Sequence, residues 1–117
     1  MTEESKKQLK EFGVDVEGSL ERMLGNEALF ERVLKKFISD DSYPLLVETL
    51  AAGDYETAFR HAHTLKGVAG NLGINALMEA DIVVVEKLRV GNLEGIEEDM
   101  KKVTELYEEV CTVLKNL

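Results

Sequence analysis

Apolar residues recur every three or four positions through most of this sequence, which is the spacing of one face of an α-helix. The clearest stripe runs from about residue 93 to residue 116 and holds Ile96, Met100, Val103, Tyr107, Val110 and Leu114. The stretch before it holds a second stripe, formed by Ile74, Leu77, Met78, Val84, Val85 and Leu88. Residues 82–85 are β-branched and locally favour a strand, but helical spacing continues on both sides, so the pattern favours a helix. Two long helices with one apolar face each predict a helix bundle.

Capping residues and glycines divide the first part of the chain into short helices. Thr2, Asp15 and Asn26 can each accept a hydrogen bond from the free amides of a first helical turn. Gly13 and Gly25 can end the first and the second of these helices. Leu9 and Phe12 would be the buried contacts of the first helix. The second helix would carry Val16, Leu20, Met23 and Leu24, and in the third Leu29, Phe30, Val33, Leu34 and Phe37 recur at helical spacing.

A break is expected at S-D-D-S-Y-P, residues 39–44. Pro44 fits the first turn of a new helix, whereas inside a helix its ring would disrupt the backbone hydrogen bonds. The new helix would hold Leu45, Leu46, Thr49 and Leu50 and would stop at Gly53. One kinked helix over residues 26–52 is the alternative interpretation.

Composition and charge narrow the class of protein. The chain has 117 residues, 44% of them hydrophobic, with one proline and no tryptophan, which predicts a single domain over residues 1–117 with an aliphatic helical core. The net charge of −9 argues against nucleic acid or an anionic membrane as a partner. No apolar run is long enough to cross a membrane. Cys111 is the only cysteine, so we expect no internal disulfide and a cytoplasmic location.

The stretch F-R-H-A-H-T-L-K-G-V-A-G-N-L-G, residues 59–73, predicts a helix capped by Asp54 whose two faces differ. One face carries Ala58, Ala62, Leu65, Ala69 and Leu72, which are apolar and mostly small, and so suit close helix packing. The opposite face carries Phe59, His63, Lys66, Gly67 and Gly70. Each glycine costs about 0.5–1 kcal/mol relative to alanine inside a helix, so helix stability does not explain these two. Without Cβ atoms beside it, the imidazole of His63 stands clear and another protein can come close.

Residues 62–73, A-H-T-L-K-G-V-A-G-N-L-G, resemble the signature of histidine-containing phosphotransfer (HPt) domains. In that signature, H-x-x-K-G is followed six residues later by a glycine, and His63, Lys66, Gly67 and Gly73 stand at the matching positions. The resemblance implies an all-α fold, an antiparallel up-down four-helix bundle, here with additional short N-terminal helices. It also implies that His63 carries a phosphoryl group between the aspartates of receiver domains.

The residues of this face have distinct expected roles. A neutral imidazole is a good nucleophile near pH 7, so His63 is the expected phosphoacceptor. Lys66 lies one turn further on, where its compact positive charge can reach the phosphoryl oxygens. We expect Gly67, Gly70 and Phe59 to contact a docked partner, although Phe59 could equally fold onto a neighbouring helix.

His61 is the competing nucleophile, and a structural role is the favoured interpretation for it. It lies about 200° around the helix from His63, towards the apolar face. The two rings therefore point apart and cannot chelate a metal ion together. No Walker-type or kinase glycine loop is present, so we expect a phosphoryl carrier with no ATP-dependent kinase activity of its own and no cofactor. The magnesium used in the transfer would belong to the receiver domain.

Two positions depart from the HPt pattern. In several HPt domains a glutamine on the following helix hydrogen-bonds the active imidazole, and the aligned residue here is Val85. A backbone carbonyl or solvent would have to orient the His63 ring instead. Asp81 falls within the apolar stripe of the same helix, where a buried carboxylate without a partner is costly. Asp81 must therefore have a partner, or the helix is rotated from the expected orientation.

The predicted function is that of a phosphorelay intermediate. Its expected partners are response-regulator receiver domains, with a sensor histidine kinase as a further candidate, and the chain is expected to be a monomer. An alternative within the same chemistry is the phosphoacceptor domain of a chemotaxis-type or hybrid histidine kinase. An alternative of another class is an adaptor bundle that binds receiver domains without any chemistry.

Overall fold

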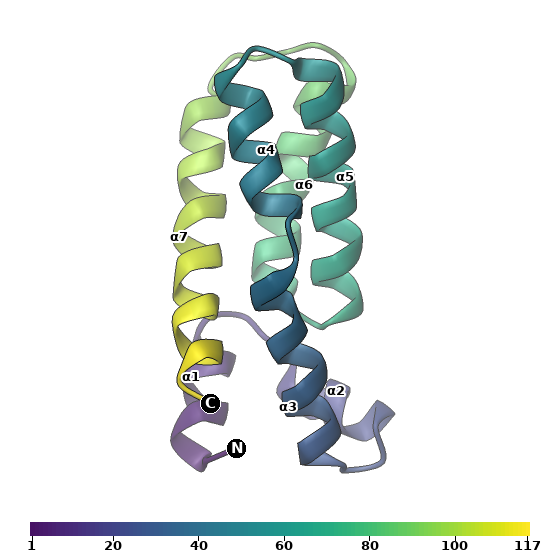
Figure 1. Ribbon diagram of the computed structural model, residues 1–117, viewed down its shortest axis with the longest axis vertical. Coiled ribbons are helices and arrows are strands. Elements are labelled where there is room, and N and C mark those ends of the chain that lie inside the picture. The colour runs from purple at the N-terminus through teal and green to yellow at the C-terminus, as the bar shows by residue number, and fades with distance from the viewer.

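The computed structural model describes all residues, 1–117, and its regular elements are helices only. In chain order they are α1 (Glu3–Glu11), α2 (Val16–Arg22), α3 (Glu27–Lys35), the 3-10 helix η1 (Lys36–Ser39), α4 (Ser42–Ala51), α5 (Tyr55–Asn71), α6 (Asn75–Arg89) and α7 (Ile96–Lys115). The last four helices run up and down as an antiparallel four-helix bundle, and α1, α2 and α3 extend its lower end (Figure 1). The predicted all-α bundle with short N-terminal helices is confirmed.

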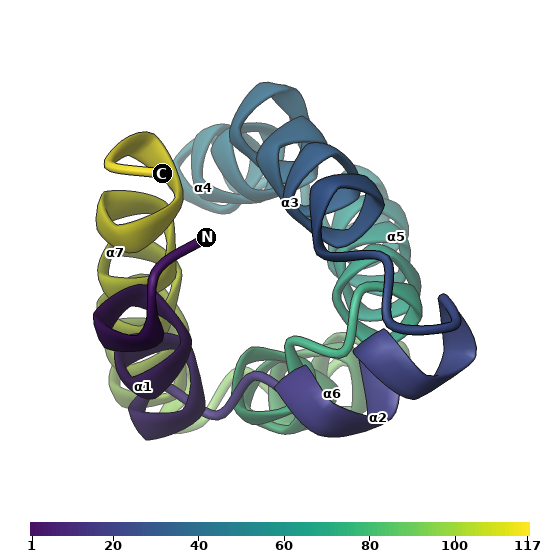
Figure 2. The ribbon, with the colours of Figure 1, turned by 90° about the horizontal axis from the view of Figure 1, so that it is seen from below.

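The view along the bundle shows how the helices share its four corners (Figure 2). The helix α5 packs against α4 on one side and α6 on the other, and α6 packs against α7. The N-terminal helix α1 lies at the lower end of α7, whereas α3 and η1 continue the corner occupied by α4. The molecule is therefore elongated, with extents of 42 × 21 × 20 Å.

The break before Pro44 is real, and the alternative of one kinked helix over residues 26–52 is wrong. After η1 the backbone becomes extended at Asp40, with ψ 131°. The Oδ1 atom of Asp40 then accepts a hydrogen bond from the amide of Ser42 at 2.9 Å. Pro44 lies in the first turn of α4, where the backbone amide that it lacks would have no helical partner.

The core follows the predicted stripes, and a group of three aromatic side chains packs at its edge. Phe37 is buried and lies edge-to-face with Tyr107, with ring centroids 5.6 Å apart. Tyr43 stacks on Tyr107 at 3.9 Å and donates a hydrogen bond to Thr104 at 2.7 Å. These contacts tie the α3–α4 corner to α7. The second helix is shorter than predicted: α2 ends at Arg22, and Leu24, which is 95% exposed and has a φ of 56°, belongs to the turn that follows it.

The segment between α1 and α2 caps helix α6 with a backbone carbonyl. Helix α6 has Ile74 at its N-cap position, and no side chain caps its free amides. The carbonyl of Gly13 instead accepts hydrogen bonds from the amides of Asn75 and Ala76 at 3.0 and 3.2 Å. The amide of Asp15 donates to the carbonyl of Gly73 at 2.8 Å. The connection between α1 and α2 therefore holds the turn between α5 and α6.

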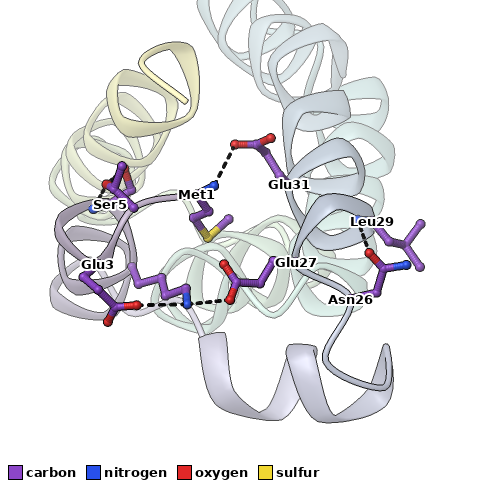
Figure 3. A network of polar contacts seen from close by, with 9 residues as sticks. Met1, Glu3, Ser5, Asn26, Glu27, Leu29 and Glu31 are labelled. Carbon is purple, nitrogen blue, oxygen red and sulfur yellow. Dashed lines mark hydrogen bonds and ion pairs between the residues drawn. The ribbon is translucent and has the colours of Figure 1, made fainter.

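Ion pairs join α1 to α3 at the lower end of the molecule (Figure 3). The Lys6 ammonium donates to Glu27 at 2.8 Å and to Glu3 at 3.2 Å, and these bonds raise the pKa of Lys6. The same bond from Lys6 lowers the pKa of Glu27. The terminal ammonium of Met1 lies 3.6 Å from Glu31. The Lys6–Glu27 pair is partly buried, with Lys6 16% and Glu27 43% exposed, and the fully buried Leu9 adds the apolar contact of α1.

Candidate functional site

Helix α5 places the candidate site on the side of the bundle. Its first turn is capped by Asp54, whose side chain accepts a hydrogen bond from the amide of Thr57 at 3.3 Å. Four residues of the predicted apolar face, Ala58, Ala62, Leu65 and Ala69, are fully buried against the neighbouring helices. Because three of these are alanines, α5 lies close to α4 and α6. This packing fixes the rotation of α5 and therefore which residues face outward.

His63 projects from the outer face of α5. It is exposed, whereas His61 two positions earlier is half-buried. No group of the protein forms a hydrogen bond with the His63 ring, so the expected backbone carbonyl that would orient it is absent. Lys66, one turn further along, is half-buried and takes part in none of the ion pairs of the chain. An accessible imidazole and an uncommitted ammonium therefore lie on adjacent turns.

The three glycines of the motif have different surroundings. A Cβ atom at Gly67 would meet no atom within 4 Å, so the surface beside His63 is open there. A Cβ at Gly70 would lie 2.9 Å from the Sδ atom of Met78 on α6, so this glycine has a packing role. Gly73 has a φ of +74°, and a Cβ there would lie 2.7 Å from the hydroxyl of Ser19. The open surface expected beside His63 is found at Gly67.

The Phe59 side chain is partly packed within the protein and partly exposed to solvent. Its side chain is half-buried against the core, and its ring centroid is 6.1 Å from that of His63. The guanidinium of Arg89, at the end of α6, lies over the Phe59 ring at 5.0 Å from the centroid. A cation over an aromatic face is attracted by the negative potential of the ring. Phe59 therefore packs onto a neighbouring helix and still presents an edge to solvent.

Two contacts show the register of α5 against α6. Phe59 meets Arg89 at one end and Gly70 meets Met78 at the other, and between these contacts each helix advances by eleven residues. Because the helices are antiparallel and rise equally per residue, His63 is level with Val85. Val85 is fully buried and has no polar atom to offer the ring.

The same register brings Lys66 level with the stretch of α6 that contains Asp81. Asp81 is fully buried, and neither of its carboxylate oxygens has a hydrogen-bond partner. Burial raises the pKa of Asp81 to about 7, and the positive charge of Lys66 opposes this rise. The helix is thus not rotated, and the hydrogen-bonded partner expected for Asp81 is absent.

The family model described as the Hpt domain matches residues 32–113. The chain belongs to the Hpt domain family. Comparisons with curated proteins and with solved structures gave no match. Hpt domains carry out histidine phosphotransfer in phosphorelay signalling and interact there with receiver domains and kinases.

The Hpt match covers the bundle and begins inside α3. Helices α1 and α2 therefore lie outside the part of the chain that the family model describes. None of the helices is both long and apolar enough to span a membrane. No three His, Cys, Asp or Glu side chains come together in a group that could hold a metal ion.

Two features of this site depend on contacts between helices. The stacking of Arg89 on Phe59 follows from the register of α5 and α6, and no local motif indicates it. The proximity of Asp81 to Lys66 has the same origin. One signal was present in the sequence, because a carboxylate in an apolar stripe was already out of place there.

Proposed function

We propose that this Hpt domain is a phosphorelay intermediate that accepts a phosphoryl group on His63 from a receiver aspartate and passes it to another receiver. The observation that carries the proposal is the exposed His63 ring beside the open surface at Gly67. A receiver has to bring its aspartyl phosphate within bonding distance of a ring nitrogen. The open surface at Gly67 gives its backbone room to do so.

The transfer exchanges one phosphorus bond for another. The lone pair of an unprotonated ring nitrogen of His63 forms the N–P bond as the P–O bond to the receiver aspartate breaks. The electron pair of the broken bond stays on the aspartate carboxylate. Because a neutral imidazole already carries this lone pair, the step requires no separate general base.

Lys66 stabilises the charge of the group in transit. Its ammonium lies one turn from His63 and takes part in no ion pair, so it can interact with the phosphoryl oxygens. Such stabilisation is strongest in an interface from which water is excluded. Phe59, half-exposed beside His63, forms part of the docking surface together with Gly67. Gly70 borders that surface where α5 packs against α6.

The division of labour between the partners follows from the chemistry. Phosphoryl transfer depends on positioning and charge stabilisation, and a divalent metal ion normally supplies part of that stabilisation. We assign this ion, magnesium, to the receiver and none to this chain. The domain is then a phosphoryl carrier that neither binds nor cleaves ATP.

The test is a transfer screen in which wild type, His63→Gln and His61→Gln are mixed with phosphorylated receiver domains. We expect acid-labile phosphate on wild type and on the His61 variant, and none on the His63 variant. Equal loss in both variants, or loss in the His61 variant alone, would refute the assignment of His63. Binding of receivers without any phosphate on wild type would instead identify an adaptor.

A further inference from the structure

Asp81 is the one buried carboxylate of the bundle, and the bundle offers it no hydrogen bond. A buried carboxylate without a partner is unfavourable when charged, and its polar atoms remain unsatisfied when it is neutral. A stable arrangement therefore needs either a proton on the group or a cation beside it. Its place on α6, level with Lys66 on α5, shows which cation is within range.

Several titratable groups on α5, α6 and α7 have other partners or face solvent. On α7, Asp99 is paired with Lys87 of α6. The titratable side chains Tyr107 and Cys111 of α7 interact with each other, and Tyr107 also stacks on Tyr43 of α4. On α5, His63 is exposed on the outer face. Lys66 is the only one whose charge acts on the pKa of Asp81.

We propose that Asp81 is a positioning residue that competes with the phosphoryl group for the ammonium of Lys66. This proposal rests on the proposed function. As a carboxylate, Asp81 draws Lys66 into the seam between α5 and α6 and away from His63. As a neutral acid, it leaves Lys66 to the phosphoryl oxygens. Movement of Lys66 to the phosphoryl group is accompanied by uptake of one proton from solvent by Asp81.

The competition makes phosphorylation and protonation mutually dependent. Whatever favours the proton on Asp81 favours Lys66 at the phosphoryl group, and the reverse holds to the same extent. The pKa of Asp81 is raised to about 7, so this exchange takes place near neutral pH. Deprotonation of Asp81 should therefore slow phosphorylation without any change in the accessibility of His63.

The experiment uses phosphoramidate, a small donor whose N–P bond breaks with loss of ammonia as His63 takes the phosphoryl group. Rates of phosphorylation of wild type and Asp81→Asn are compared between about pH 5.5 and about pH 8.5, a range that extends to both sides of the pKa of Asp81. The ratio of the two rates cancels every pH dependence that the two reactions share, that of the donor included. We expect equal rates at the acidic end and a roughly tenfold faster Asp81→Asn variant at the basic end.

Two controls separate positioning from a structural effect. Glu79→Gln removes one negative charge from an exposed site on the same helix and should follow wild type at every pH. In a Lys66→Ala background, Asp81→Asn should have no effect, because no Lys66 ammonium remains for Asp81 and the phosphoryl group to compete for. If Asp81→Asn does not fold, titration of the Asp81 carboxyl by NMR replaces it, and Lys66→Ala should raise the pKa of that carboxyl further.

The outcomes are distinct. A rate ratio independent of pH, or an effect of Asp81→Asn that persists without Lys66, overturns the inference and leaves the proposed function intact. So does a pKa of Asp81 that is unchanged by Lys66→Ala. If wild type takes up no more phosphoryl group than His63→Gln, the proposed function itself fails.

Discussion

Gly67 and Gly70 are three residues apart on α5, and the absence of a side chain serves a different purpose at each. Gly70 lies against the Met78 side chain of α6, whose Sδ atom would be 2.9 Å from an added Cβ. Gly67 faces open space, so packing within the chain does not account for it. A residue that weakens a helix without improving its packing suggests a requirement from outside the chain, here the approach of a receiver.

We expect Gly67→Gln to keep the fold and to slow transfer from a phosphorylated receiver by roughly ten- to a hundredfold, because the added side chain displaces the reacting groups. Phosphorylation by phosphoramidate should remain near the wild-type rate, since this donor is too small to meet the new side chain. Circular dichroism checks the fold. The control is Thr112→Gln, which places the same side chain at an exposed position of α7. Wild-type transfer from the receiver would mean that Gly67 has no role in docking.

Asp81 should also make the stability of the domain depend on pH. The unfolded chain loses the Asp81 proton near pH 4, whereas the folded protein keeps it until about pH 7. Between these values the folded state holds the extra proton, so stability falls as the pH rises and levels off above the folded pKa. Wild type should lose on the order of a few kcal/mol relative to Asp81→Asn over this window.

Urea unfolding of both proteins between about pH 4 and about pH 8, the range of this titration, measures the effect. The difference between the two unfolding free energies is the informative quantity, because other carboxylates titrate equally in both. Parallel curves would show that Asp81 ionises at an ordinary pKa.

At the scale of the elements, the N-terminal segment replaces a missing helix cap. Ile74 cannot cap α6, so the carbonyl of Gly13 meets the first amides of that helix. This requires very close approach: a Cβ at Gly13 would lie 2.2 Å from the Cβ of Ala76, and φ at Gly13 is +82°. A glycine at this position is thus needed both for its backbone angle and for the contact.

We expect Gly13→Ala to lower the free energy of unfolding by about 2–4 kcal/mol, since it combines a left-handed backbone with a clash. Gly91→Ala is the matched control, because Gly91 has a φ of +71° and no atom lies within 4 Å of its added Cβ. That variant should lose only about 1 kcal/mol, the cost of the backbone angle. Chemical denaturation compares the two, and equal losses would mean that the segment around Gly13 is not held against α6.

At the scale of the whole molecule, two of the large exposed apolar residues, Val47 and Tyr55, line the same hollow. The large exposed ones come from the turn after α2 and from α4, α5 and α6: Leu24, Val47, Tyr55, Val83 and Val90. The largest hollow, about 570 Å³, lies between α4 and α7, where Val47 and Met100 line it. Leu24, Val83 and Val90 do not line this hollow, and single exposed apolar residues are ordinary on a protein surface.

The free domain should therefore be a monomer in solution. Light scattering should give the mass of one chain, 13.1 kDa, and small-angle X-ray scattering a radius of gyration near the 14.5 Å of the Cα atoms. The mass of two chains would contradict this. Val47→Lys would then show whether the groove between α4 and α7 is the interface, because a lysine in its wall should restore the monomer.

The sequence by itself determined the helices and the identity of the motif. Helix limits follow from local physics: Thr2, Asp15, Asn26 and Asp54 each accept a hydrogen bond from an amide of the next turn. The outward position of His63 follows equally from helical periodicity, because the buried alanine face fixes the rotation of α5. These features depend on residues within one or two turns of each other, so their spacing along the chain was enough to predict them.

The tertiary structure decided what depends on contacts between helices. Leu24 belongs to an apolar stripe in sequence but to an exposed turn in the fold. Gly67 and Gly70 are alike in sequence, and only the register of α5 against α6 places Met78 beside one of them. The same register brings Asp81 into range of Lys66. Register is set by side-chain packing along the whole seam, so no local pattern contains it, and both the charge balance and the open surface of the site depend on it.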